Sequence, residues 1–251
     1  MSKIALVTGG SRGLGKEMAL RIADKELNVV LTYKSNKDEA TKVVEAIEAK
    51  GRQAFAVQLD TADIASFDTT VQEVKTMLKE KMGKDTIDFL VNNAGIGLTN
   101  SISETTEEQF DTLSNIHLKG VFFLTQKLIP MLNAGGGIVN VSSGLARFSM
   151  PGYAAYAMMK GGIEVFSRYL AKELGSRDIR VNTLAPGAIE TDFGGGAVRD
   201  NEQYNKAVAS ATALGRAGLP EDIGGVVAFL CTDEARWINA QRIEVSGGMN
   251  I

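Results

Sequence analysis

The chain has 251 residues, of which 44% are hydrophobic and 23% are charged, and its formal net charge is −3. This balance does not favour nucleic-acid binding, which usually requires a basic face, and one cysteine (Cys231) with one histidine (His117) argues against an internal disulfide or a zinc site. No apolar run approaches the ~18 residues that cross a membrane, and the N-terminus lacks a signal-peptide pattern. We expect a soluble cytoplasmic protein that binds no metal, nucleic acid or membrane.

Apolar, β-branched segments alternate with helical patterns along the chain. Strands are predicted at residues 3–8, 28–33, 53–59, 87–92, 137–142, 179–184 and 242–245, and several are apolar nearly throughout, as in strands covered on both faces. Helices are predicted between them, for example at 14–25, with Leu14, Met18 and Ile22 on one stripe, and at 36–50, beginning at the cap residue Asn36. The alternation predicts one α/β domain over residues 1–251, with a parallel sheet and helices on both faces.

The first predicted strand ends in a glycine-rich turn, "TGGSRGLG", at residues 8–15. Gly9, Gly13 and Gly15 allow a tight turn, close approach of the backbone to a pyrophosphate and close packing of helix against strand. Amide groups at the start of the next helix would point at the phosphates. We interpret this turn as a dinucleotide-binding loop; an ordinary strand-to-helix turn is the alternative. Its spacing, G-x-x-x-G-x-G, differs from the usual G-x-G-x-x-G fingerprint.

A second pattern, "YAAYAMMK" at residues 153–160, follows the fifth predicted strand. Tyr156 and Lys160 are four residues apart, so a helix places them on one face. The pKa of a phenol is ~10, and a neighbouring ammonium is expected to lower it by stabilising the phenolate. Ser143, thirteen residues before Tyr156, can hydrogen-bond to a substrate carbonyl or hydroxyl. Tyr153 has no cation four residues later, so we interpret it as a loop or pocket residue; an exposed helical pair is the alternative for Tyr156 and Lys160.

These segments together resemble the classical short-chain dehydrogenase/reductase family over essentially the whole chain. The matching elements are, in order, "TGGSRGLG", "NNAG" at 92–95, "IVNVSS" ending at Ser143, "YAMMK", "PGAIET" at 186–191 and "LGRAGLPEDI" at 214–223. The resemblance implies a Rossmann-type doubly wound sheet of seven strands and an NAD(P)-dependent oxidoreductase. It also implies that Tyr156 transfers the substrate proton, that Lys160 binds the nicotinamide ribose and lowers the tyrosine pKa, and that Ser143 orients the substrate carbonyl.

The only histidine, His117, lies in "SNIHLKGVFF" at residues 114–123. It occupies the position at which the resembled family usually has a fourth catalytic residue, an asparagine in a phrase like "N-L-K-G-V-F"; Asn115 would need a register shift. The resemblance implies that this residue acts largely through its backbone carbonyl, which holds a water in a proton relay to the lysine. Although imidazole titrates near neutral pH, we expect His117 to keep the relay and not to replace Tyr156 as the acid–base group.

The end of the second predicted strand bears on the choice of cofactor. An acidic residue there would bind the ribose 2′-hydroxyl and repel a 2′-phosphate, but this position is Tyr33, followed by Lys34 and Ser35, with Arg12 in the glycine-rich turn. Two cations and a hydroxyl suit a 2′-phosphate, so NADP(H) is favoured over NAD(H); an ordinary surface lysine at 34 is the alternative. The expected cofactor-binding residues are Gly9, Ser11, Arg12, Gly13, Leu14, Gly15, Lys34, Ser35, Asp60, Thr61, Asn92, Ala94, Gly95, Tyr156, Lys160, Pro186, Gly187, Ile189 and Thr191.

The substrate side is predicted from a lid segment at about residues 190–213, whose three consecutive glycines, 194–196, indicate flexibility. Apolar and aromatic pocket candidates favour a small or medium hydrophobic ketone or secondary alcohol, as for a carbonyl reductase; core packing is the alternative for each. They are Leu145, Phe148, Tyr153, Phe193 and Tyr204.

Two other functions and the assembly state complete the expectations. A 3-oxoacyl-[acyl-carrier-protein] reductase often has a basic cluster that meets the acidic carrier, and residues 130–137, where it would lie, contain no cation. Arg177 could serve instead from another part of the chain, so this function remains an alternative. A dinucleotide-sensing regulator without turnover typically lacks the tyrosine or the lysine, and this chain has both.

The predicted helices at 121–132 and 163–174 are more apolar than helices that bury only one face need to be. The resemblance implies a homotetramer, in which the terminal Ile251 would pack against a neighbouring subunit.

Overall fold

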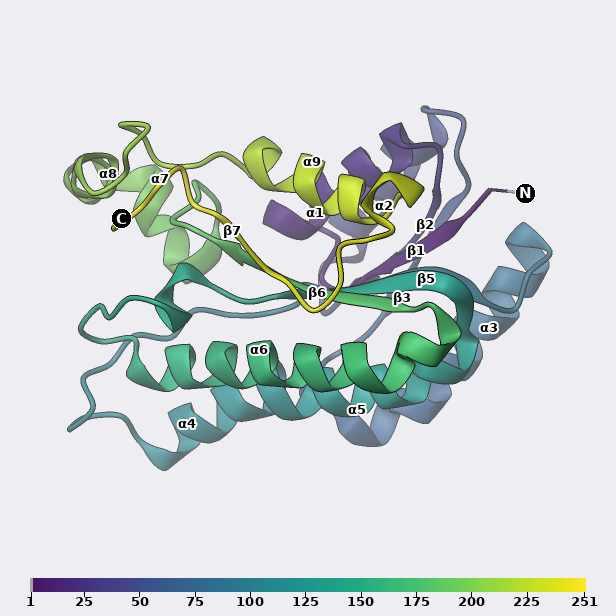
Figure 1. Ribbon diagram of the computed structural model, residues 1–251, viewed down its shortest axis with the longest axis horizontal. Helices are drawn as coiled ribbons and strands as arrows, with labels where there is room; N and C mark the ends of the chain where they lie inside the picture. The colour runs from purple at the N-terminus through teal and green to yellow at the C-terminus, as the bar shows by residue number, and fades with distance from the viewer. Residues whose placement is uncertain (1) are drawn as a thin grey trace.

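The computed structural model describes residues 2–251, which form one seven-stranded parallel sheet flanked by helices (Figure 1). The strand order is β3-β2-β1-β4-β5-β6-β7, so the direction of progression reverses beside β1. Ligands bind doubly wound sheets at this switch point, outside the carboxyl ends of the strands. The doubly wound fold is confirmed. The strands are β1 (Ile4–Val7), β2 (Asn28–Tyr33), β3 (Ala54–Gln58), β4 (Ile87–Asn92), β5 (Leu132–Val141), β6 (Arg180–Pro186) and β7 (Arg242–Val245).

Helices cover both faces of the sheet (Figure 1). One layer contains α1 (Gly13–Asp24), α2 (Lys37–Glu48) and α9 (Pro220–Leu230); the other contains α3 (Phe67–Met82), α4 (Glu107–Ser114), α5 (Gly120–Leu128) and α6 (Ala154–Leu174).

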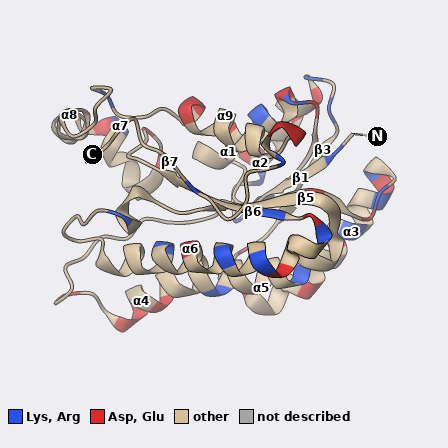
Figure 2. Cartoon of the chain, viewed as in Figure 1, with Lys and Arg blue, Asp and Glu red and all other residues tan. Residues whose placement is uncertain are grey.

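Alternate residues of β1 belong to different cores, which explains why this central strand is apolar throughout. Ala5 and Val7 pack in the core with α1 and α9, whereas Ile4 and Leu6 pack in the core with α3, α5 and α6. Because both faces are covered, all four residues are buried. Charged residues belong mainly to the helices and loops, and the strands contain few of them (Figure 2).

Most predicted elements form where expected. The Asn36 side chain caps α2 by accepting a hydrogen bond from the Glu39 amide at 3.1 Å. On α1, Met18 and Ile22 are fully buried, and Leu14 packs at the edge of the same core. The helical stripe therefore faces the sheet, as its spacing predicts.

Two boundaries around β5 differ from the prediction. The helix expected over 121–132 ends at Leu128, and a 3₁₀ turn at Ile129–Met131 contains Pro130, which has no amide hydrogen to continue the helix. The strand expected from 137 begins at Leu132, with a register shift against β4. A Cβ on Gly136 would lie 2.1 Å from the Asp88 carbonyl oxygen, so glycine is needed for this close approach of β5 to β4.

The predicted lid segment forms a turn (Phe193–Gly196) whose three glycines have left-handed backbones, followed by α7 (Ala197–Asp200) and α8 (Glu202–Ser210). The C-terminal segment folds back beside it (Figure 1), and Thr212 pairs with Met249 in an antiparallel bridge. Among residues 2–251, no helix has the length and apolar character to span a membrane.

Candidate active site

A cavity of about 610 Å³ opens at the carboxyl end of the sheet. It is lined by Ser143, Tyr156, Lys160 and His117, and by every expected cofactor-binding residue except Asn92. These residues come from segments that are up to 182 positions apart in the sequence, since Gly9 and Thr191 both line the cavity. The fold thus gathers the residues that the motifs predict into one site.

The glycine-rich turn forms a cradle between β1 and α1. Gly9 and Gly13 have left-handed backbones, with φ of +66° and +52°. A Cβ on Gly15 would lie 2.2 Å from the Gly9 carbonyl oxygen, so only glycine allows α1 to start this close to the turn. Arg12, at the N-cap of α1, gives the first amides no side-chain hydrogen bond. This cradle and its helix N-terminus fit the pyrophosphate of a dinucleotide.

The cations expected at the 2′-phosphate lie at the rim of the cavity. Lys34 Nζ is 2.8 Å from an Asp60 carboxylate oxygen, and Arg12 Nη1 is 3.7 Å from Asp192. The Lys34 and Arg12 side chains are 66% and 68% exposed, so these pairs contribute little stability and a phosphate can compete for both cations. Hydrogen bonds from Lys34 and from the Ala62 amide help to hold the pKa of Asp60 below its usual range, against the opposing effect of its burial.

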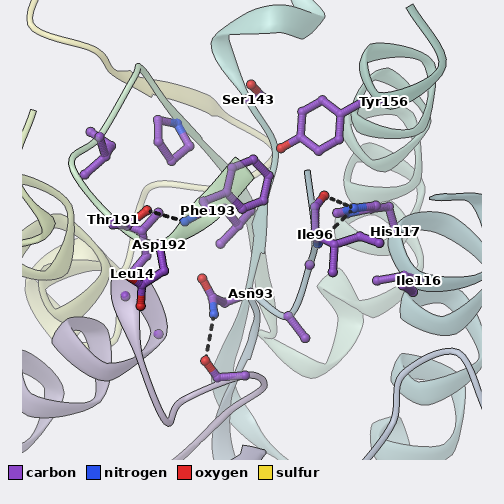
Figure 3. Close-up of a pocket in the computed structure, with 18 of the residues that line it drawn as sticks. Leu14, Asn93, Ile96, Ile116, His117, Ser143, Tyr156, Thr191, Asp192 and Phe193 are labelled. Atoms are coloured by element: carbon purple, nitrogen blue, oxygen red, sulfur yellow. Dashed lines mark hydrogen bonds between the residues drawn. The ribbon is translucent and has the colours of Figure 1, made fainter. Parts of the chain in front are cut away.

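Ser143 and Tyr156 face each other in the cavity (Figure 3), and Lys160 lines it beside them. Ser143 lies two residues beyond β5, where its hydroxyl accepts a hydrogen bond from the Leu145 amide at 3.2 Å. Tyr156 and Lys160 are one turn apart on α6 and are only 7% and 5% exposed. Lys160 Nζ donates to the Val141 carbonyl oxygen at 2.8 Å and lies 5.6 Å from the centroid of the Tyr156 ring.

The backbone at Ser143 is held by a network of charged groups. Arg242 Nη2 donates to the Ser143 carbonyl oxygen at 3.3 Å, and its Nε donates to Glu164 at 2.8 Å. Ser142 donates its hydroxyl hydrogen to the same Glu164 carboxylate at 2.7 Å. Glu164 is one turn after Lys160, so the network ties the end of β5 to α6 and β7.

The electrostatics of Tyr156 and Lys160 differ from the expectation. Burial raises the pKa of Tyr156, and a hydrogen bond with Ser143 only partly opposes this effect. Burial also lowers the pKa of Lys160 to about 8. The pKa of Tyr156 is therefore shifted upward, opposite to the expected lowering, because desolvation of the phenol is the largest cause of the shift.

His117 lies in a π-helical turn (Asn115–Lys119) between α4 and α5 and is buried against Tyr156. The two rings meet edge to face, with centroids 5.2 Å apart and an interplanar angle of 87°. His117 Nε2 lies 2.8 Å from the Ile96 carbonyl oxygen and 3.3 Å from the Ile96 nitrogen (Figure 3). The shorter contact favours the tautomer with the proton on Nε2.

This tautomer leaves Nδ1 as an acceptor, and Nδ1 is the one buried side-chain polar atom of residues 2–251 without a hydrogen-bond partner. Burial, assisted by the positive charge of Lys160, lowers the pKa of His117 to about 3. The imidazole is therefore neutral at physiological pH. His117, and not Asn115, lines the cavity.

The placement of Asn92 differs from the expectation. Its side-chain amide is buried and donates to Thr125 Oγ1 at 2.9 Å and to Asn140 Oδ1 at 2.8 Å, away from the cavity. The next residue, Asn93, lines the cavity and donates to the Thr8 carbonyl oxygen at 2.9 Å. Successive strand residues face opposite sides of a sheet, so "NNAG" alone does not indicate which asparagine faces the cofactor side.

The five predicted pocket residues all line the cavity near Ser143 and Tyr156. Tyr153 interacts with Tyr204 of α8, and burial together with this hydrogen bond raises the pKa of Tyr153 to about 12. Other residues that line the cavity were not predicted from the sequence, because only tertiary packing brings them to the site. They include Ile96, Ile116, Met150, Val198 and Met249.

Comparison with known proteins assigns the chain to a family. The family model described as enoyl-(acyl carrier protein) reductase matches residues 9–250. A curated relative, 3-oxoacyl-[acyl-carrier-protein] reductase FabG of Staphylococcus aureus, is 39% identical over 252 residues, which covers 99% of this chain and 98% of that protein. The chain belongs to the short-chain dehydrogenase/reductase family and is an NAD(P)-dependent oxidoreductase.

Solved structures of ketoreductases have the same fold. LugOII, described as a promiscuous reductase that catalyses keto-reduction at C1 during lugdunomycin biosynthesis, is 37% identical with a TM-score of 0.94 and covers 99% of this chain and 98% of its own. The angucycline C-6 ketoreductase LanV with bound NADP is 35% identical, also with a TM-score of 0.94, and covers 99% of this chain and 95% of its own.

Proposed function

We propose that this enzyme transfers hydride between NADP(H) and a small or medium hydrophobic ketone or secondary alcohol that is not attached to a carrier protein. The observation that carries the proposal is the pocket in front of Ser143 and Tyr156. Its walls are apolar and aromatic, with the side chains of Leu145, Phe148 and Phe193 among them. Such walls favour an apolar substrate, and the few polar groups at Tyr156 and Ser143 orient its one reacting carbonyl.

NADP(H) is the cofactor that the site supports best. The glycine cradle fits the pyrophosphate, Arg12 and Lys34 suit a 2′-phosphate, and Tyr33 ends β2 where an acidic residue would disfavour that phosphate. The relative LanV, described with bound NADP, supports this choice. Bound NADPH would supply the hydride. By family position, Ile189 and Thr191 would hold the nicotinamide carboxamide and Lys160 the ribose.

The side chains of the site suit carbonyl reduction with Tyr156 as the proton donor. Because burial raises its pKa, Tyr156 is protonated at neutral pH and can donate its hydroxyl proton to the alkoxide oxygen that forms. Ser143 orients the carbonyl by a hydrogen bond. The Lys160 ammonium, 5.6 Å from the Tyr156 ring centroid, stabilises the phenolate left after proton transfer.

The second candidate is a 3-oxoacyl-[acyl-carrier-protein] reductase, which the curated relative favours. An acidic carrier needs free cations beside the cavity. The guanidinium of Arg177 instead donates to the Ile129 and Leu132 carbonyl oxygens, and residues 130–137 contain no cation. Arg177 thus stabilises the connection between α5 and β5, which makes it less available to a carrier.

Side-by-side kinetics with NADPH separate the two candidates. We expect 2-tetralone, a bicyclic ketone, to be reduced with a higher kcat/KM than acetoacetyl-pantetheine. We also expect that attaching the acetoacetyl group to acyl-carrier protein gives no further gain. A gain of tenfold or more with the carrier would instead support the acyl-carrier reductase. No NADPH oxidation with any of the three would contradict both and would favour a sensor.

We propose in addition that the enzyme is a homotetramer. Phe122 of α5 packs against Phe166 of α6 at 4.9 Å yet is 44% exposed, and Val165 and Tyr169 of α6 are 45% and 67% exposed. Apolar patches of this kind on a helix pair mark association sites.

A cytoplasmic location is proposed because Cys231, the chain's one cysteine, is a buried free thiol, which suits a reducing compartment.

A further inference from the structure

Phe193 is a large aromatic side chain that stays 45% exposed although it lines the cavity. Its ring lies against Tyr156, with centroids 5.9 Å apart and an interplanar angle of 59°. Figure 3 shows the ring between the Tyr156 hydroxyl on one side and Leu14 and Asn93 on the other. The ring therefore lies next to the reacting group, where a ketone must approach.

The two rings contact each other directly, so no flat molecule fits between them in this arrangement. Aromatic pairs in contact have centroids 4.5–7 Å apart, and the observed 5.9 Å is within this range. A ketone that reaches the Tyr156 hydroxyl must therefore move Phe193 aside or pack along its open face.

The backbone after Phe193 allows such a movement. Gly194, Gly195 and Gly196 all have left-handed backbones, with φ of +61°, +74° and +78°. No atom lies within 4 Å of a Cβ placed on Gly194 or Gly195, so the side-chain positions of these two glycines are open, whereas Gly196 is buried and a Cβ there would lie 2.4 Å from Asp200 Oδ2. On the other side, the Phe193 amide donates to Thr191 Oγ1 at 3.2 Å, which anchors the segment beside the cofactor cradle.

Gly97, from a loop distant in the sequence, leaves space for the Phe193 ring. A Cβ on Gly97 would lie 2.9 Å from Phe193 Cε1 and 3.3 Å from Gly194 Cα. Gly97 does not have a left-handed backbone and does not line the cavity. A methyl group at position 97 would therefore push the ring without touching the cofactor cradle.

We propose that Phe193 determines substrate specificity: its ring withdraws from Tyr156 as a ketone enters and then packs against the face of the substrate, which selects planar aromatic ketones. The inference rests on the proposed function and names its substrate class. An offset or edge-to-face aromatic contact stabilises a flat substrate beyond the area it buries, and a puckered saturated ring cannot make this contact.

The test compares two ketones with the same carbon skeleton, 2-tetralone and 2-decalone. We expect the wild-type enzyme with NADPH to have a higher kcat/KM for 2-tetralone, and Phe193→Leu to reduce this preference by about two- to tenfold. The variant should change kcat/KM for 2-decalone much less. An equal loss for both ketones, or an unchanged ratio, would overturn the inference.

Gly97→Ala provides a matched second perturbation. It should lower the preference for 2-tetralone in the wild type, because the added methyl displaces the ring, and should have no effect on the preference in a Phe193→Ala background. Such non-additivity is the signature of two residues in contact. Additive effects would show that Gly97 acts on the site by another route and would count against the inference.

Binding of an unreactive probe separates this inference from the proposed function. If the wild type reduces neither ketone, the proposed function is wrong, and calorimetric titration of the NADPH-loaded enzyme with 2-naphthol and with trans-2-decalol, neither of which NADPH can reduce, decides the role of Phe193. We expect tighter binding of 2-naphthol, with this preference lost in Phe193→Leu. Equal binding by the wild type, or a preference that survives in the variant, would overturn the role of Phe193.

Discussion

Replacement of His117 by asparagine tests whether the only histidine of the chain takes part in proton transfer. The imidazole is buried, and its pKa is lowered to about 3. At pH 7 a group with this pKa is protonated in roughly one molecule in 10⁴. We therefore expect His117 not to act as the proton donor, and to contribute through its contacts with Tyr156 and Ile96.

The size of this contribution follows from the two contacts. The edge-to-face contact with Tyr156 is worth about 0.5–1.5 kcal/mol, and the hydrogen bond to Ile96 about 1 kcal/mol. Asparagine loses the ring contact but can keep a hydrogen bond. We expect His117→Asn to keep the turnover rate within about tenfold of wild type, since tenfold corresponds to about 1.4 kcal/mol of barrier.

The assay measures kcat and kcat/KM with 2-tetralone between pH 5 and pH 10, and thermal unfolding of each variant checks that it is folded. His117→Phe is the matched control, because it keeps a ring beside Tyr156 and loses the Ile96 bond. It should retain turnover but lower stability by about 1–3 kcal/mol, since it leaves the partly buried Ile96 carbonyl without its partner. This reasoning would be refuted if a folded His117→Asn variant turned over ~10²-fold more slowly, or worse, and lost an ionisation near ~6.5 from its pH profile.

Four further results are expected. Tyr156→Phe should reduce turnover by ~10²–10⁴-fold with nearly unchanged NADPH affinity, measured by fluorescence titration; more than a tenth of wild-type activity would contradict its role. The pKa of Lys160 is about 8 in the folded state, below its unfolded value, so the unfolded state binds more protons between pH 8 and pH 10.5. The free energy of unfolding of the wild type, measured by urea unfolding, should therefore rise by up to ~3 kcal/mol over this range relative to that of Lys160→Met. If the two proteins show the same pH dependence of this free energy, the pKa of Lys160 is not lowered. Arg12→Ala combined with Lys34→Asp should shift the kcat/KM preference toward NADH, and a wild-type preference for NADH would show that the 2′-phosphate assignment is wrong. Sedimentation should give a mass near four times 26.8 kDa at micromolar concentration, and a monomer mass would exclude the tetramer.

The sequence by itself determined the strands, the class of site and most of its members. Strands covered on both faces are mostly apolar, so β1, β2 and β4 are visible as short hydrophobic runs with few polar residues. A backbone that passes within 2.2 Å of a would-be side chain requires glycine, so the cradle at Gly15 is visible as a motif. Local spacing also determined that Tyr156 and Lys160 share a helix face, because four residues make about one turn.

Only the tertiary structure decided which groups face the cavity and how they titrate. The sheet turns Asn92 toward Thr125 and leaves Asn93 at the site, a choice that depends on strand register. The pKa of a side chain depends on what surrounds it in space, so the raised pKa of Tyr156 and the neutral state of His117 follow from burial by segments distant in sequence. The contact of Phe193 with Tyr156 has the same origin, because packing between distant segments carries no local signature in the chain.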